Sequence, residues 1–283
     1  MVRHKSFRTA DELKSFCARE APLGVYYSTA LYKDPENRDM EAKGWLGADL
    51  AFDIDGDHLD TPNCRGMELI TFGCLEDAKE EAVRLSDVLR EELGLNGEAI
   101  YSGHRGFHVH VRSAEVRGLS AAERRKLVDF LLARNLDLSI FEKRINKKYI
   151  KLYEEEPVGS LVRIMKGLQD SNYSIHIDEV VTADVHRLIR LPGSLNNKTG
   201  FIALPIPKSF LEKEINYILD KAIVFKKGNI NIKLKKPVKE VLGERINRGD
   251  GEEVVVPAYV GVYLYLQGYA ELERRRERGE AKK

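Results

Sequence analysis

Two aspartates in a strand-like segment are the first residues whose types and spacing suggest chemistry. Asp53 and Asp55 alternate with Phe52 and Ile54 after an apolar pair at 50–51. Because alternate residues of a β-strand share a face, the two carboxylates would point to one side and the two apolar side chains to the other. The rise per residue places such carboxylates roughly 7 Å apart, so they could converge on one hard cation or on a pair of cations.

The ligand type favours Mg²⁺ or Mn²⁺ at this position and not Zn²⁺, because hard cations prefer oxygen ligands. Asp57 would join the acidic face only if the strand continued past Gly56, which we expect to end it. The simplest alternative is an edge strand whose acids face solvent. The apolar lead-in argues against that alternative, because a strand that is buried up to its acids usually holds them for a purpose.

The second segment is a turn bracketed by glycines, Ser102-Gly103-His104-Arg105-Gly106-Phe107-His108. Glycines permit close backbone approach, so backbone N–H groups and polar side chains could together cradle a triphosphate. The side chains that could serve as donors are Ser102, His104, Arg105 and His108. His110 would share a face with His108, and we expect a packing role for it. The alternative is an ordinary hairpin with a solvated arginine and a histidine on the sheet.

The third segment begins at Asp184 and continues with Arg187, Arg190 and Lys198. The acid could complete a three-carboxylate metal cluster, and the cations could meet phosphates that the metal also contacts. The alternative is a helix end with solvated arginines. Paired acids, a phosphate-binding turn and an acid-plus-arginine element together match the requirements of two-metal nucleotidyl transfer.

The remaining pattern predicts a single α/β domain over residues 1–283 that carries these segments. We expect strands at 24–30, 98–102, 107–112, 175–181, 201–206 and 254–256. We expect helices at 10–19, 76–93, 120–135, 209–222 and 257–272, and a short helix or turn at 185–191. Residues 114–173 are interpreted as a helical insertion, and residues 273–283 as a frayed charged tail.

Composition limits the possible partners. Among 283 residues, 46 Lys and Arg nearly balance 45 Asp and Glu, so nucleic-acid contact would have to come from local basic patches. The clusters at 143–151 and 226–239 are such patches, although they could equally be solvated faces. No apolar run is long enough to span a bilayer, and the start does not read as a signal peptide. Cys17, Cys64 and Cys74 suggest no disulfide framework, so we expect a soluble, cytoplasmic protein in a reducing setting.

The chain resembles the small, catalytic subunit of archaeal DNA primases of the archaeo-eukaryotic type. The resemblance rests on Asp53-Ile54-Asp55, on the turn at 102–108 and on Asp184-x-x-Arg-Leu-Ile-Arg-Leu-Pro-x-Ser-Leu, in the family's order. The apolar segment at 260–266 also resembles the family's C-terminal element, so the resemblance extends from Arg3 to about Tyr269. It implies the primase fold, with mixed β-sheets flanked by helices.

The resemblance also implies roles for individual residues. The metal-binding catalytic acids would be Asp53, Asp55 and Asp184. The segment that holds the incoming nucleotide would contribute Ser102, His104, Arg105 and His108, with Arg190 on the triphosphate and Arg3 near the nucleotide. The implied activity is synthesis of short RNA primers on single-stranded DNA from ribonucleoside triphosphates with Mg²⁺ or Mn²⁺. The implied partner is a large iron–sulfur subunit, in a heterodimer.

The chain departs from the family pattern in three places. Asn196 stands where the family usually has a nucleotide-binding His. The loop at 58–74 usually carries a zinc knuckle, but here it has only Cys64, Cys74 and His58, so we expect no structural zinc. Relatives also have several dozen residues before the match to Arg3. Two alternatives therefore stay open: a related polymerase that extends existing ends, and a non-catalytic nucleic-acid-binding subunit.

Overall fold

The computed structural model describes residues 2–132, 134 and 175–272. Most of the expected insertion, its basic cluster at 143–151 and the expected tail at 273–283 lie outside the described residues. Within the described residues, no helix combines the length and apolar character needed to cross a membrane.

A four-stranded antiparallel sheet of order β4-β6-β5-β8 forms the centre of the fold. Its strands are β4 (Leu50–Asp55), β6 (Gly106–Val111), β5 (Glu98–Tyr101) and β8 (Leu204–Pro205). In the β4–β6 ladder, Asp53 lies opposite His108 and Asp55 lies opposite Gly106. The register therefore places the acidic strand directly beside the strand that follows the glycine-bracketed turn.

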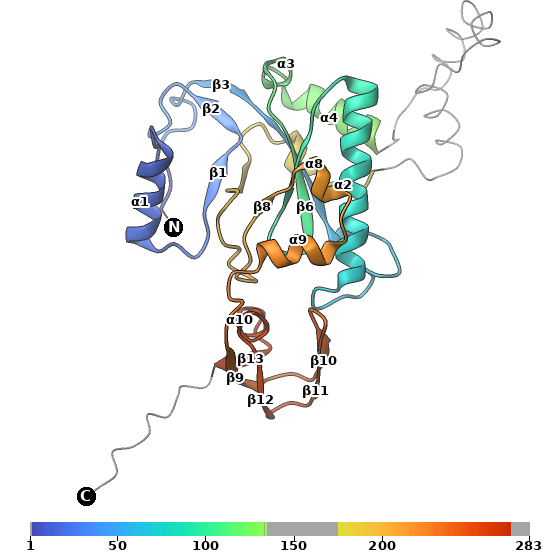
Figure 1. Ribbon diagram of the computed structural model, residues 1–283. Helices are drawn as coiled ribbons and strands as arrows, with labels where there is room; N and C mark the ends of the chain where they lie inside the picture. Colours follow the sequence, from blue (N-terminus) through green and yellow to red (C-terminus); the bar gives the residue numbers. More distant parts are fainter. Residues whose placement is uncertain (1, 133, 135–174, 273–283) are drawn as a thin grey trace, which may run out of the picture.

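One face of this sheet is covered by α2 (Phe72–Leu93), which is the longest helix in Figure 1. Its N-terminus is capped by the Thr71 hydroxyl and its C-terminus ends at Gly94, which adopts a left-handed conformation with φ 65°. Phe52 and Ile54 are fully buried in the core that this helix shares. The apolar face of β4 is thus fixed against the helix, which confirms the predicted alternation and directs the acidic face away from the core.

Two small antiparallel sheets lie on the opposite side from α2. The first pairs β1 (Tyr26–Ser28) with β7 (Leu188–Arg190), and the second pairs β2 (Ala30–Tyr32) with β3 (Trp45–Ala48). The short helix α7 (Glu179–Ala183) packs beside β4, where the Thr182 hydroxyl donates to the Ala51 carbonyl at 3.0 Å.

The remaining elements frame this centre. They are α1 (Ala10–Glu20), η1 (Gly56–His58), α3 (Ala114–Arg117), α4 (Ala121–Leu131), α8 (Lys208–Leu211) and α9 (Ile215–Ala222). The C-terminal group gathers below the central sheet in Figure 1 and consists of β9 (Asn229–Leu234), β10 (Val238–Val241), β11 (Glu244–Arg248), β12 (Glu253–Pro257), α10 (Ala258–Leu266) and β13 (Ala270–Leu272).

Several predicted elements are wrong. The strand expected at 175–181 is replaced from Glu179 by α7, because the Asp178 carboxylate accepts from the Val180 N–H at 2.9 Å and caps a helix. The helix or turn expected at 185–191 contains β7, which pairs with β1. The single helices expected at 209–222 and 257–272 are each divided, into α8 with α9 and into α10 with β13.

The cysteine prediction is also wrong, because Cys64 and Cys74 form a disulfide in the structure. Both residues are buried, and the bond joins the loop that follows the acidic strand to the first turn of α2. A Cβ atom at Gly56 would lie 2.6 Å from the Cys74 sulfur, so the disulfide packs directly against the end of β4. Cys17 remains a free thiol.

Candidate functional site

A cavity of about 190 Å³ opens where the acidic face of β4 and β6 meets the β1–β7 pair. It brings together six of the residues predicted from the sequence: Asp53, Asp55, Ser102, His104, His108 and Arg190. Its other polar lining residues are Tyr26, Arg187, Asn196 and Lys198. Residues from four distant parts of the chain therefore line one cavity.

The two carboxylates line this cavity from the face of β4 that points away from the core. The pKa of Asp53 is raised to about 7, chiefly by burial and then by the negative charges of Asp55 and Asp178, which outweigh the opposing effect of the Arg187 guanidinium. His108 Nε2 lies 3.7 Å from the Asp53 carboxylate. This excess of negative charge suits a divalent cation with oxygen ligands, so Asp53 and Asp55 fit the predicted Mg²⁺ or Mn²⁺.

The third acid near this pair is Asp178, which the sequence analysis did not single out. Its backbone N–H donates to the Asp53 carbonyl at 2.8 Å, while its carboxylate caps α7. The predicted third acid, Asp184, does not line the cavity, and its carboxylate accepts from the His186 N–H at 2.8 Å. In the described part of the chain, no group of three or more His, Cys, Asp or Glu side chains is arranged to hold a metal.

The glycine-bracketed turn is closed by the Ser102 N–H, which donates to the Gly106 carbonyl at 3.0 Å. Gly103 adopts a left-handed backbone with φ +76°, which other residues rarely do. Gly106 is required for a different reason: a Cβ atom there would lie 1.8 Å from the Ile54 carbonyl oxygen. These two glycines let the turn sit against β4, with Ser102 and His104 on the cavity.

Asn196 holds the same turn from the other side. Its side-chain amide donates to the Ser102 carbonyl at 3.1 Å, and its oxygen accepts from the Lys198 N–H at 2.9 Å. The Thr199 hydroxyl donates to the Gly103 carbonyl. Asn196 is buried and lines the cavity. Its hydrogen bond to Ser102 also fixes the turn in place.

Arg190 also lines the cavity and is itself buried. Its guanidinium donates to the Leu195 carbonyl at 3.0 Å, to Asn197 Oδ1 at 2.9 Å and to the Tyr26 hydroxyl at 2.6 Å. It also stacks over the Tyr26 ring, 4.6 Å from the centroid. All of these acceptors are uncharged, so the positive charge remains available to an anion.

Tyr26 lines the cavity and contacts Arg190, and the sequence reasoning missed it. Its place opposite Arg190 follows from the β1–β7 register, which pairs the two residues directly. No local pattern around Tyr26 predicts that pairing, because its partner Arg190 lies 164 residues away in the sequence.

Two predicted nucleotide-binding residues lie outside the cavity lining. Arg105 forms an ion pair with Asp57, and its Nε atom is buried without a hydrogen-bond partner among the described residues. Arg3 is exposed near the start of the chain and does not line the cavity. The structure therefore assigns Asp57 a contact with Arg105, although Asp57 does not belong to the acidic face.

The histidines at the cavity are neutral near pH 7. Burial, followed by the nearby Arg105 charge, lowers the pKa of His104 to about 4. Burial likewise lowers the pKa of His108 to about 4, with Arg190 and Arg187 as further causes. Both rings can therefore donate or accept hydrogen bonds, while the positive charge at the cavity comes from Arg187, Arg190 and Lys198.

The chain is similar to known proteins over nearly its whole length. A family described as DNA primase small subunit matches residues 52–207. The DNA primase small subunit PriS of Pyrobaculum calidifontis is 51% identical over 275 residues, covering 96% of this chain and 88% of that protein. The PriS of Sulfolobus acidocaldarius is 34% identical over 287 residues, covering 95% of this chain and 83% of that protein.

Among solved structures, a polymerase domain from Mycobacterium tuberculosis ligase D in complex with DNA aligns with a TM-score of 0.40 and 16% identity. The alignment covers 71% of this chain and 57% of that chain. At this level of similarity the match carries no argument about function.

Proposed function

This chain belongs to the DNA primase small subunit family, and from that premise we propose that it is the catalytic subunit of a DNA primase. It would synthesise short RNA primers on a single-stranded DNA template from ribonucleoside triphosphates. The observation that carries the proposal is the cavity itself, where Asp53 and Asp55 face Arg187, Arg190 and Lys198. Few ligands other than a metal-bound polyphosphate carry both the positive charge that the acids need and the negative charge that the three cations need.

Asp53 and Asp55 would hold Mg²⁺ or Mn²⁺ through carboxylate oxygens. When bound there, divalent ions would supply the charge that lowers the pKa of an attacking 3′-hydroxyl and stabilises a leaving pyrophosphate. Asp184 is a further proposed acid of this site. Because Asp184 does not line the cavity, the proposal requires its side chain to move towards the other two acids.

The chain's own groups would position the triphosphate. Arg190 is pre-oriented by three hydrogen bonds to uncharged acceptors, so binding an anion needs no reorganisation of its side chain. The turn presents Ser102 and His104 to the same space, and Asn196 keeps that turn in place. Preorganised donors of this kind supply orientation and charge stabilisation at low cost.

The proposed partners are a large iron–sulfur subunit in a heterodimer and the single-stranded template, with no membrane involved and a cytoplasmic location. The similarity to proteins named DNA primase small subunit PriS supports the role in DNA replication. Arg3 and Arg105 are retained as proposed nucleotide contacts, which would require their side chains to move towards the cavity.

The test is primer synthesis on an unprimed single-stranded template by the chain together with its large subunit. Asp53→Asn and Asp55→Asn should each abolish dinucleotide and primer formation. The matched control is Asp60→Asn, because Asp60 is an exposed acid in the following loop that pairs with Arg65 and does not line the cavity. Retained synthesis by either cavity variant would refute the proposal, and extension of a supplied primer without any initiation would favour an end-extending polymerase.

A further inference from the structure

Helix α10 carries no charged side chain, although part of its surface faces solvent. Its buried side includes Val260, Tyr263 and Leu264, which belong to the core. On its outer side, Tyr265 and Leu266 are 48% and 36% exposed. Because the solvent-facing side of a helix normally carries polar or charged residues, this outer side has the character of a surface that a partner covers.

Phe225 extends this outer side beyond the helix. A Cβ atom at Gly200 would lie 3.1 Å from Val262 and 3.3 Å from the Phe225 ring, so these two side chains meet at Gly200. Val262 shares a face of the helix with Tyr265 and Leu266, which follow it by three and four residues. Phe225 is itself 41% exposed. We call Phe225, Val262, Tyr265 and Leu266 the aromatic stripe.

The aromatic stripe adjoins the cavity through the loop that carries Lys198, which lines it. The Gln267 side-chain amide, at the end of α10, donates to the Lys198 carbonyl at 2.6 Å. Gly200, against which the stripe packs, follows Lys198 by two residues. A long ligand that extends from the cavity past Lys198 would therefore run onto the stripe.

Two lysines beside the stripe have no counter-ion. Within the described part of the chain, neither Lys198 nor Lys227 forms an ion pair, and Lys227 is exposed. Its neighbour Lys226, by contrast, pairs with Asp220 at 2.9 Å. The basic cluster predicted at 226–239 therefore keeps positive charge next to the stripe, which favours an anionic partner.

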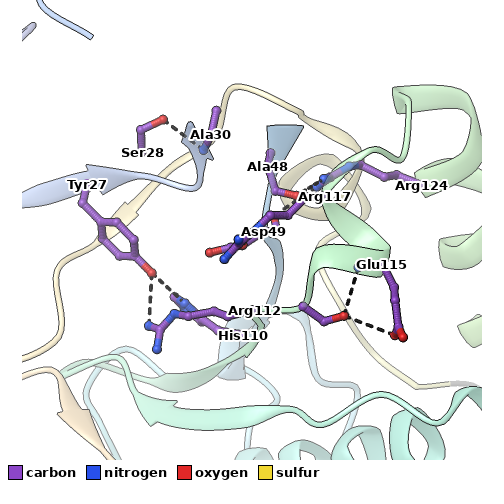
Figure 2. Close-up of polar contacts among 11 residues, drawn as sticks. Tyr27, Ser28, Ala30, Ala48, Asp49, His110, Arg112, Glu115, Arg117 and Arg124 are labelled. Atoms are coloured by element: carbon purple, nitrogen blue, oxygen red, sulfur yellow. Dashed lines mark hydrogen bonds and ion pairs between the residues drawn. The ribbon is translucent and has the colours of Figure 1, made fainter. Parts of the chain in front are cut away.

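Arg112 and Arg117, which lie near the start of β4, do have acidic partners. Arg117 Nε donates to the Asp49 carboxylate at 2.7 Å (Figure 2). Arg112 forms an ion pair with Glu98 and also donates to the Tyr27 hydroxyl at 3.5 Å (Figure 2). The cationic and aromatic groups there are matched to one another, whereas those along the aromatic stripe face solvent.

We propose that the aromatic stripe, with Lys198 and Lys227, binds single-stranded DNA. The Phe225 and Tyr265 rings would stack on bases, and the two lysines would contact phosphates. Exposed aromatic rings beside unpaired cations are the two features that bind single strands independently of sequence. An apolar protein partner would match the rings but would leave both positive charges unmatched. That the bound strand is the template rests on the proposed function, whereas the binding itself does not.

The first test measures the affinity of the full chain for a dye-labelled oligothymidylate by fluorescence anisotropy, without nucleotide. Phe225→Leu and Tyr265→Leu should each weaken binding about fivefold or more, because leucine keeps the apolar bulk and cannot stack on a base. Phe225→Trp should retain the affinity. Thermal unfolding checks that each variant is folded. Unchanged affinity in both leucine variants overturns the proposal.

The second test replaces the oligonucleotide with an abasic one of the same length, which keeps the phosphates and lacks the bases. The leucine variants should bind it as well as the unaltered protein does. If they bind the abasic strand as poorly as the oligothymidylate, the two rings act through the protein's structure and the stacking role is refuted.

The third test examines the lysines through salt dependence. Lys227→Gln should reduce the slope of log Kd against log salt concentration by about 0.7, the value for one phosphate contact with a single strand. The matched control is Lys126→Gln, because Lys126 is exposed on α4, at the other end of the molecule from the C-terminal group in Figure 1. Equal slopes in Lys227→Gln and the unaltered protein would contradict the phosphate contact.

The outcomes separate this surface from the proposed function. If DNA binding follows the expected pattern but no primers are made, the proposed function fails while the binding surface stands. If the leucine variants bind DNA normally but no longer bind the large subunit, the stripe is a protein-docking face and the proposal is wrong.

Discussion

Removing the charge of Asp53 should stabilise the metal-free protein at neutral and alkaline pH. The pKa of this carboxyl is raised to about 7, chiefly by burial and then by the charges of Asp55 and Asp178. A rise of that size corresponds to about 4 kcal/mol against the ionised folded state. The side chain is 28% exposed, so solvent screening reduces the expected penalty to about 2 kcal/mol.

The sign of the pH dependence follows from the raised pKa. Below about pH 4 Asp53 is protonated in both the folded and the unfolded chain, so it has no effect on the free energy of unfolding. As the pH rises towards 7, the unfolded chain ionises while the folded chain retains its proton, and stability falls. The penalty is complete above about pH 8, where Asp53→Asn should raise the Tm by about 5 °C.

The assay is thermal unfolding in EDTA at pH 4.5 and pH 8, with Asp57→Asn as the control. Asp57 already has a counter-ion in Arg105, so its neutralisation should not stabilise the protein. Addition of Mg²⁺ should raise the Tm of the unaltered protein and have little effect on Asp53→Asn. If Asp53→Asn is no more stable than the unaltered protein at pH 8 in EDTA, the electrostatic reasoning about this cavity is wrong.

Three further changes test the frame of the site by thermal or urea unfolding. Cys64→Ser opens a loop of about ten residues and should lower the free energy of unfolding by about 3 kcal/mol. Dithiothreitol should destabilise the unaltered protein but not the variant. Equal sensitivity of the two proteins to dithiothreitol would contradict the disulfide. Gly106→Ala forces a Cβ atom against the Ile54 carbonyl and should lower the free energy of unfolding by about 3 kcal/mol. The control is Gly118→Ala, whose Cβ atom would meet no atom within 4 Å and which should lower it by about 0.5 kcal/mol or less. Arg124→Met leaves three buried or half-buried backbone carbonyls without their donor and should cost about 3 kcal/mol or more; a neutral effect would show that water replaces the guanidinium.

The central strand and the turn could be predicted from the sequence because their signals are local. Alternation of Phe52 and Ile54 with two acids defines both faces of β4 wherever the strand lies in the fold. Glycines at 103 and 106 define a turn in which no larger side chain fits. Both signals depend on a few consecutive residues, and the structure confirms both.

The other side of the cavity depends on contacts between distant residues, and no local pattern contains them. β7 is only three residues long and is stabilised by pairing with β1, so the cations near it suggested a helix end. Residues 175–181 read as a strand because they are rich in β-branched side chains. Asp178 followed by Glu179 is the signal that could have indicated a helix start there, through an N-cap and an acidic first turn.

The arrangement of charge in the cavity is consistent with the proposed ligand. Arg187 lowers the pKa of Asp53 by less than burial and the neighbouring acids raise it. The negative charge of the acids is therefore not balanced by the surrounding side chains. Arg190 forms no ion pair among the described residues, because its acceptors are a carbonyl, an amide and a phenol. A cation alone would satisfy only the acids, and a free phosphate would satisfy only the arginines. The proposed nucleoside triphosphate, with its divalent ions, would supply both charges in one complex.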